Sequence, residues 1–159
     1  KDDIAPFEIL QQMVTHYQSR LASRKIDVHL ELKTGSPVTL KGDADRLAQL
    51  FINLLENTLR YTDSPGVLKI KALRTDSRLT ISFEDTGPGV PPEAIGRLFD
   101  RLYRVDTSRS RELGGSGLGL AICKQIVEAH GGSIQAANAS SGGLLFRIEL
   151  PLASSPPEG

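Results

Sequence analysis

The sequence is poor in several residue types, and each scarcity excludes a class of protein. The 159 residues include no tryptophan and a single cysteine, Cys123, which excludes an internal disulfide and a cysteine-based zinc site. A lone thiol fits a reducing cytosol. No apolar run approaches the roughly 18 to 20 residues of a membrane-spanning helix, and the charged start at Lys1 does not resemble a signal peptide. We therefore expect a soluble, cytoplasmic piece of protein.

An excess of charge of either sign is also missing. Nineteen basic residues balance nineteen acidic ones, so no overall field attracts nucleic acid or an anionic membrane, and any phosphate site must be local. With 39% hydrophobic and 24% charged residues, the composition is that of a globular protein of one domain. We expect that domain over residues 1–152, followed by a disordered Pro- and Ser-rich tail at 153–159.

The hydrophobic pattern predicts an α+β fold. Apolar residues recur at three- and four-residue spacing, which predicts helices over 7–24, 44–61 and 118–129, with a shorter helix at 91–99. Alternation predicts strands at 26–33, 38–41, 67–74, 79–84, 133–137 and 144–150. These elements predict a two-layer α/β sandwich, with three main helices on one face of a mixed, mostly antiparallel sheet of about five strands. Residues 104–117 have hardly an apolar side chain and predict a mobile loop.

A polar stripe on the second helix is the first candidate for chemistry. Asn53, Asn57 and Arg60 are four and three residues apart and so share one side of the helix. A carboxamide oxygen can ligate a hard cation and an arginine can bind phosphate oxygens, as a metal triphosphate requires. On spacing alone, a solvated helix face is the favoured interpretation.

The segment 85–89, which reads DTGPG, is the second candidate because it follows a predicted strand. Asp85 there can accept a hydrogen bond from an exocyclic amine such as that of adenine. Gly87 and Gly89 allow the backbone to approach a flat ring closely. A tight turn with a polar cap is the alternative interpretation.

The third candidate is the glycine-rich run at 114–120, which reads GGSGLGL and leads into a helix. A helix N-terminus exposes unpaired N–H groups and partial positive charge, which favour an anion. The run fits neither a P-loop nor a dinucleotide-binding fingerprint, and on its own it is weak evidence.

Taken together, four motifs in a fixed order resemble the catalytic domain of bacterial sensor histidine kinases. Residues 53–61, NLLENTLRY, are similar to the N-box of that family, and DTGPG at 85–89 is similar to its first glycine box. LFDRLYR at 98–104 is similar to the F-box, and GSGLGL at 115–120 to the second glycine box. The resemblance spans 43–151 and implies the two-layer Bergerat-type ATP-binding fold of gyrase, histidine kinase and MutL-type ATPases.

The resemblance implies a role for each matching residue. Asn57 would bind Mg²⁺ that bridges the phosphates of ATP, Arg60 would contact phosphate, and Asp85 would hold the adenine amine. Arg60 and Asn53 are the implied catalytic residues, and residues 104–114 would form a lid over the nucleotide. The implied nucleotide-binding set is Asn53, Asn57, Arg60, Tyr61, Asp85, Gly87, Gly89, Tyr103, Arg104, Gly115, Ser116, Gly117, Leu118 and Gly119.

Asn53 bears on the type of reaction. Gyrase and mismatch-repair ATPases resemble this fold but carry a glutamate there as general base for water, and an amide cannot take that proton. Asn53 therefore favours a kinase over a hydrolase. Glu56 points elsewhere around the helix, and we expect it to be an ordinary solvated glutamate.

Two features depart from the family pattern. Gly142-Gly143 is followed by Leu144 and Leu145, where the family usually carries threonine. The family's phosphoacceptor motif is also missing, since His16, His29 and His130 lie in other contexts. We expect these three histidines to be structural or solvated.

The resemblance finally implies an activity and its partners. The domain would transfer the γ-phosphoryl group of ATP to a histidine on a separate dimerisation and phosphoacceptor domain, which would pass it to a response regulator receiver domain. The fragment would be a monomer without affinity for nucleic acid, cut from a homodimer anchored in the bacterial inner membrane. A non-catalytic, nucleotide-gated interaction module and a gyrase-like hydrolase remain alternatives.

Overall fold

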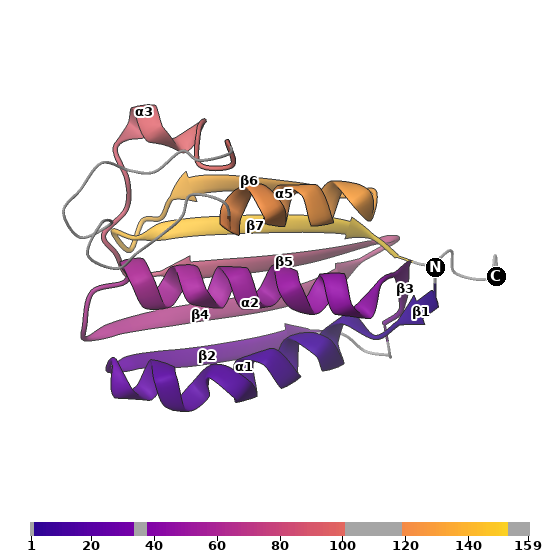
Figure 1. Cartoon of the computed structure of the whole chain (residues 1–159), viewed down its shortest axis with the longest axis horizontal. Coiled ribbons are helices and arrows are strands. Elements are labelled where there is room, and N and C mark those ends of the chain that lie inside the picture. Colours follow the sequence, from indigo (N-terminus) through magenta and orange to yellow (C-terminus); the bar gives the residue numbers. More distant parts are fainter. Residues whose placement is uncertain (1, 34–37, 101–118, 153–159) are drawn as a thin grey trace.

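The computed structural model describes residues 2–33, 38–100 and 119–152, and Figure 1 shows their arrangement. The elements run in the order β1 (Asp2–Ile4), α1 (Pro6–Ser23), β2 (Ile26–Lys33), β3 (Leu40–Gly42), α2 (Ala44–Tyr61), β4 (Gly66–Thr75), β5 (Arg78–Asp85), α3 (Pro92–Ile95), α5 (Gly119–Ala129), β6 (Ser133–Asn138) and β7 (Leu144–Pro151). The predicted tail lies outside these residues, so the domain boundary at 152 stays a prediction. No described helix is long and apolar enough to cross a membrane.

A five-stranded sheet forms one layer, and α1, α2 and α5 lie side by side across one of its faces (Figure 1). The strand order is β2-β4-β5-β7-β6, with β2 and β4 parallel and every other neighbouring pair antiparallel. The α2 helix, which lies between β2 and β4 in the chain, provides the crossover that a parallel neighbour needs. The predicted two-layer sandwich is confirmed.

The alternation along the strands separates a buried face from an open one. On β5, Leu79, Ile81 and Phe83 are buried against the helices, and the residues between them lie on the face without helices. Asp85 follows in the same alternation, so its carboxylate lies on the helix-covered face although it is charged. The alternation along β5 therefore places the carboxylate of Asp85 in the interior.

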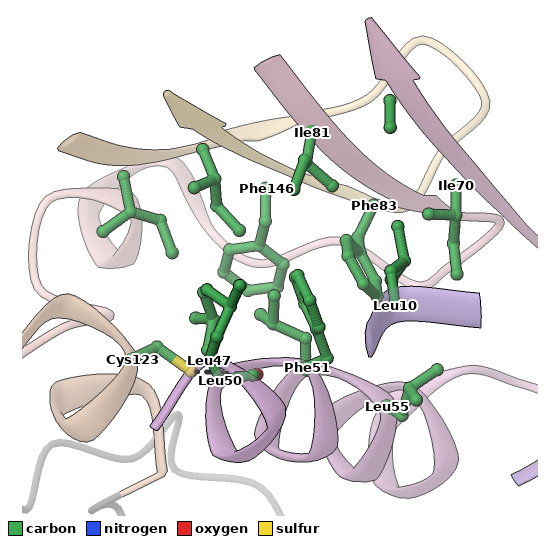
Figure 2. Close-up of a cluster of buried hydrophobic side chains, with 14 of the residues drawn as sticks. Leu10, Leu47, Leu50, Phe51, Leu55, Ile70, Ile81, Phe83, Cys123 and Phe146 are labelled. Carbon is green, nitrogen blue, oxygen red and sulfur yellow. Dashed lines mark hydrogen bonds between the residues drawn. The ribbon is translucent and has the colours of Figure 1, made fainter. Parts of the chain in front are cut away.

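The α2 helix supplies the middle of the core. Asp43 caps it by accepting hydrogen bonds from the N–H groups of Asp45 and Arg46. Figure 2 shows side chains of α2 directed at the sheet, where the rings of Phe51 and Phe83 stack at a centroid distance of 6.4 Å. The thiol of Cys123, on α5, donates to the carbonyl oxygen of Leu50 at 3.8 Å (Figure 2). These contacts fix α5 beside α2.

Three short elements differ from the predictions. The strand expected at 38–41 is Leu40–Gly42, and it pairs with β1 in a separate two-stranded sheet. The strand β1 was not predicted, because three residues with two charges carry no periodic signal. The helix expected over 91–99 ends at Ile95, where Gly96 follows and tighter turns take over.

Candidate nucleotide site

The predicted polar stripe lies on α2 beside its buried face. Leu54, Leu55 and Leu59 are buried, while Asn53, Asn57, Arg60 and Tyr61 are all half-buried. The leucines hold the helix against the sheet, and the stripe stays partly open along one side. The structure thus places the four predicted residues together, on the last turns of one helix.

Asn53 links this stripe to the start of α5. Its carboxamide nitrogen donates to the carbonyl oxygen of Gly119 at 3.3 Å, and its oxygen accepts from Gln49 at 2.7 Å. Gly119 is the first residue of α5 and the last glycine of the predicted second glycine box at 115–120. Both the nitrogen and the oxygen of the Asn53 amide are hydrogen-bonded to other residues of the protein. Asn53 therefore holds the start of α5 against α2.

The carboxylate of Asp85 is the most constrained group of the site. Its Oδ1 atom accepts from the N–H groups of Gly87 at 2.9 Å and Leu144 at 3.2 Å, and only 6% of the residue is exposed. Burial raises the pKa of this carboxyl group above its ordinary value, and the nearby charge of Glu84 acts in the same direction. The N–H groups of Leu144 and Gly87 oppose the shift without cancelling it. Both backbone hydrogen bonds end on Oδ1.

The end of α2 is joined to the end of β5 next to this carboxylate. The N–H of Asp63 donates to the carbonyl oxygen of Gly87 at 2.7 Å. Thr62, which caps α2, places its hydroxyl beside the Asp85 carboxyl group. At a rise of about 1.5 Å per helical residue, Asn57 lies only about 7.5 Å along the axis from Thr62. The amide stripe and the buried acid therefore belong to one region.

The two glycines after Asp85 contact the β6–β7 turn. Gly87 has φ +118°, which favours glycine, and a Cβ atom there would lie 2.9 Å from the carbonyl oxygen of Gly142. At Gly89 a Cβ would lie 2.2 Å from Oδ1 of Asn138. That amide pairs with both backbone groups of Val90, at 2.9 Å and 2.8 Å. These glycines are required for packing inside the protein, whatever they offer a ligand.

Sequence reasoning missed the residues of the β6–β7 turn. Gly143 packs so closely on the backbone of Asp85 that a Cβ there would lie 2.0 Å from its carbonyl oxygen. Ser141 donates to that same oxygen at 3.1 Å, or to the carboxylate of Glu84. The paired glycines at 142 and 143 were the available signal. Leu144 contacts Asp85 through its backbone N–H, so no side-chain hydroxyl is needed for that bond.

The prediction that Glu56 is an ordinary solvated glutamate was wrong. Its Oε2 atom accepts from the Tyr17 hydroxyl at 2.7 Å and from the Arg20 guanidinium at 2.9 Å. Desolvation raises the pKa of Glu56, but these two hydrogen bonds and the nearby charges of Arg20 and Arg60 outweigh it, and the pKa lies below its ordinary value. Glu56 is thus engaged with α1, on another side of α2 from Asn57.

Several predicted residues lie outside the part of the chain that the structure describes. These are Tyr103, Arg104, Gly115, Ser116, Gly117 and Leu118, together with the predicted lid at 104–114. The three histidines are described, and they are as expected. His16 and His29 are exposed, and His130 is buried with both ring nitrogens within hydrogen-bonding distance of the backbone.

The arrangement can serve a ligand with a donor at one end and negative charge at the other. Asp85 offers acceptor oxygen at the end of β5, and Asn57 and Arg60 offer a carboxamide and a guanidinium on α2. The start of α5 adds the partial positive charge of a helix N-terminus. Figure 1 shows α5 running alongside α2, and the start of α5 contacts Asn53 on the α2 stripe.

Comparison with known proteins identifies relatives of this chain. The signal transduction histidine-protein kinase BaeS of Escherichia coli is 50% identical over 136 residues, which are 86% of this chain and 29% of BaeS. The mycobacterial sensor histidine kinase MprB has a similar structure, with a TM-score of 0.83 at 26% identity over 97% of this chain and 100% of the other. The histidine kinase ShkA, solved full-length in complex with AMPPNP, gives a TM-score of 0.80 at 28% identity over 97% of this chain and 31% of ShkA.

The chain thus spans less than a third of BaeS, the share being 29%. A family described as histidine kinase-, DNA gyrase B- and HSP90-like ATPases matches residues 42–154. That range begins just before the cap of α2 and contains every predicted site residue. The chain belongs to this family of ATP-binding proteins, and its architecture is that of the catalytic domain of a sensor histidine kinase.

Proposed function

We propose that this chain binds Mg-ATP and delivers the γ-phosphoryl group to a histidine on a separate helical domain. The carrying observation is the environment of Asp85. Its Oδ1 atom is fixed by two backbone N–H groups, which orients the carboxylate at the joint between β5 and the end of α2. An acid held in this way can accept a hydrogen bond from the exocyclic amine of adenine. AMPPNP, the compound bound to ShkA, is an analogue of ATP and supports a nucleotide as the ligand.

The phosphates would lie between α2 and the start of α5. Asn57 would provide a carboxamide oxygen for Mg²⁺, which usually takes one or two protein ligands and completes its shell with phosphate oxygens and water. Arg60 would pair with phosphate oxygens. Asn53 is a positioning residue in this proposal, because its hydrogen bond to Gly119 holds the start of α5 facing the stripe. Bound Mg²⁺ would neutralise phosphate charge during transfer.

Two observations favour phosphoryl transfer over hydrolysis. Hydrolysis requires a general base for water, and the Asn53 amide cannot act as one. The carboxylate of Glu56, three residues further along α2, is held by Tyr17 and Arg20. Neither side chain is in a state to activate water beside Asn57. The base for a histidine nucleophile would then come from the acceptor domain.

The remaining partners follow from the activity. The acceptor would be the dimerisation helices of the same parent protein, a homodimer anchored in the inner membrane with this domain in the cytoplasm. The phosphohistidine would supply a response regulator receiver domain. Residues 103, 104 and 115–118, with the lid between them, would close the site over the nucleotide.

The test mixes this chain with purified dimerisation helices of its parent and ATP labelled at the γ-phosphate. We expect label on the helices that is stable to base and labile to acid, as for phosphohistidine. An Asn57→Ala chain should lose most of this transfer, while Asn138→Ala, altered on the neighbouring turn, serves as a control for general damage near the site. ATP binding without transfer would support a nucleotide-gated module, and rapid release of free phosphate would support a hydrolase.

A further inference from the structure

The hydroxyl of Thr62 is buried without a hydrogen-bond partner. Thr62 is 0% exposed, and within residues 2–33, 38–100 and 119–152 its Oγ1 is the one buried side-chain nitrogen or oxygen atom that lacks a partner. Leaving a buried hydroxyl unsatisfied costs roughly 1 to 3 kcal/mol. Native proteins keep few such groups, so each one calls for an explanation.

The position of this hydroxyl is set by the backbone on both sides. The N–H of Thr62 donates to the carbonyl oxygen of Thr58 at 3.0 Å, and the N–H of Asp63 donates to that of Gly87 at 2.7 Å. These bonds hold the side chain beside the Asp85 carboxyl group, close enough for the hydroxyl to lower the pKa of that group. The pair completes no hydrogen bond of standard geometry in the free site.

Thr62 is also well placed to be the hydroxyl next to Asp85. Leu144 and Leu145 stand where the family usually carries threonine, and Leu144 reaches the carboxylate only through its N–H. The two backbone donors both end on Oδ1. These two bonds leave the other carboxylate oxygen without a backbone donor, and Thr62 at the end of α2 places a hydroxyl beside the same carboxyl group.

We propose that Thr62 is a positioning residue that makes Asp85 select an amino purine over an oxo purine. This inference rests on the proposed ATP site. The Thr62 hydroxyl beside the carboxyl group lowers the pKa of that group and so favours its ionised form, which only accepts hydrogen bonds and suits the 6-amino group of adenine. A protonated carboxyl group would present an O–H donor, which suits the 6-oxo group of hypoxanthine. The hydroxyl thereby determines whether Asp85 offers the purine a hydrogen-bond acceptor or a hydrogen-bond donor.

The chain offers a matched pair of substitutions. Thr62→Val keeps the shape of the side chain, including the methyl group that lies 2.9 Å from the position of a Cβ on Gly66. Thr58→Val changes another buried threonine of the same helix, whose hydroxyl donates to the carbonyl oxygen of Leu54 at 3.2 Å. Both variants lose one buried hydroxyl, but only the first loses it beside Asp85.

The experiment is calorimetric titration of the chain with ATP and with ITP, each with magnesium. ITP differs from ATP in carrying an oxo group in place of the amine. We expect Thr62→Val to weaken ATP binding about threefold to tenfold, the effect of one hydrogen bond, and to leave ITP binding unchanged or stronger. Thr62→Ser and Thr58→Val should both keep the preference for ATP. Thr62→Cys, with a weak donor, should shift the preference in the same direction as valine and serves if the valine variant does not fold.

An equal preference for ATP in the Thr62→Val and Thr58→Val chains would overturn this inference while leaving the ATP site intact. An Asp85→Asn chain that binds ATP as tightly as the wild type would overturn the proposed site, and this inference with it. The two failures are therefore distinguishable within one set of titrations.

Discussion

At the scale of single residues, Asp85 combines a charge with deep burial. Its alternation with Ile81 and Phe83 carries it to the helix-covered face, and two backbone N–H groups keep one of its oxygens occupied there. Burial holds its pKa above the ordinary value, so the folded protein bears a cost for the ionised form. A ligand-binding role for the Asp85 carboxylate explains why a buried acid is kept at this position despite its free-energy cost.

Asp85→Asn should weaken ATP binding by roughly 1.5 to 3 kcal/mol, the usual value of a hydrogen bond to a charged group. The amide keeps an oxygen for the N–H groups of Gly87 and Leu144 and turns its NH₂ donor toward the donor on adenine. Titration calorimetry measures the change. Glu84→Gln removes the neighbouring charge without touching this contact and should alter the affinity by less than about twofold. An unchanged dissociation constant for Asp85→Asn would remove Asp85 from the site.

Glu56 gives a prediction about stability and pH. Its folded-state pKa is lowered from 4.5, so its bonds to Tyr17 and Arg20 stabilise the protein above pH 4.5 and are lost as the pH falls through the lower folded value. Glu56→Gln should cost about 0.2 to 1 kcal/mol at neutral pH, since the pair is partly exposed, and close to nothing in acid. Urea denaturation at both pH values measures this difference. Glu128→Gln, exposed on α5, should cost nothing at either pH, and a pH-independent loss for Glu56→Gln would contradict the assignment.

At the scale of elements, His130 joins the end of α5 to the start of α2. Its Nδ1 lies 2.8 Å from the carbonyl oxygen of Ile126, and its Nε2 accepts from the N–H of Asp43 at 3.1 Å, so the ring is the neutral tautomer protonated at Nδ1. Gly42 has no room for a Cβ, because His130 Cδ2 would lie 2.4 Å away. The two helices that flank the candidate phosphate region are thus tied at their far ends as well.

His130→Ala should destabilise the protein by about 1 to 3 kcal/mol, because a buried ring is removed and the partly buried N–H of Asp43 loses its partner. Thermal and denaturant unfolding measure the loss, and ATP affinity measured well below the melting temperature should change little. His29→Ala, on the open face of the sheet, should lie within about 0.5 kcal/mol of the wild type. Equal effects of the two substitutions would show that the His130 bond contributes nothing.

The elements that the sequence predicted well are those with a long local period. Helix α2 begins after its Asp43 cap and ends at Tyr61 as predicted, and the strict alternation from Ile26 to Lys33 marks β2 to the residue. The β1–β3 pair was missed because its strands are three residues long. The partners of Glu56 were missed because Tyr17 is 39 residues away, a contact that no local pattern reports.

Contacts between residues far apart in the sequence also limited the prediction of the site. The stripe on α2 and the acid at the end of β5 were predicted from spacing and from the family resemblance. The pairing of Asn138 with Val90 spans 48 residues, and the approach of Gly143 to Asp85 depends on how β7 pairs with β5. Thr62 carried no signal of its own, since a threonine after a helix is common. Only the folded backbone brings its hydroxyl to the carboxylate.

At the scale of the whole molecule, the sheet layer and the helix layer contribute different groups to the candidate site. The sheet fixes the acid and the turn that packs on it, and the helix layer presents the amides, the arginine and a helix N-terminus beside it (Figure 1). The leucines of α2 pack into the core beneath the sheet (Figure 2). Because α2 also carries the stripe, this packing sets the distance between Asn57 and Asp85. A single bound nucleotide therefore has to reach from the sheet to the helices.

The most direct measurement is a crystal structure of this chain grown with magnesium and AMPPNP. We predict the adenine amine within hydrogen-bonding distance of the Asp85 carboxylate, and the phosphates and metal between Asn57 and the first turn of α5. A nucleotide bound at another surface, with Asn57 and Asp85 both free of it, would contradict the account.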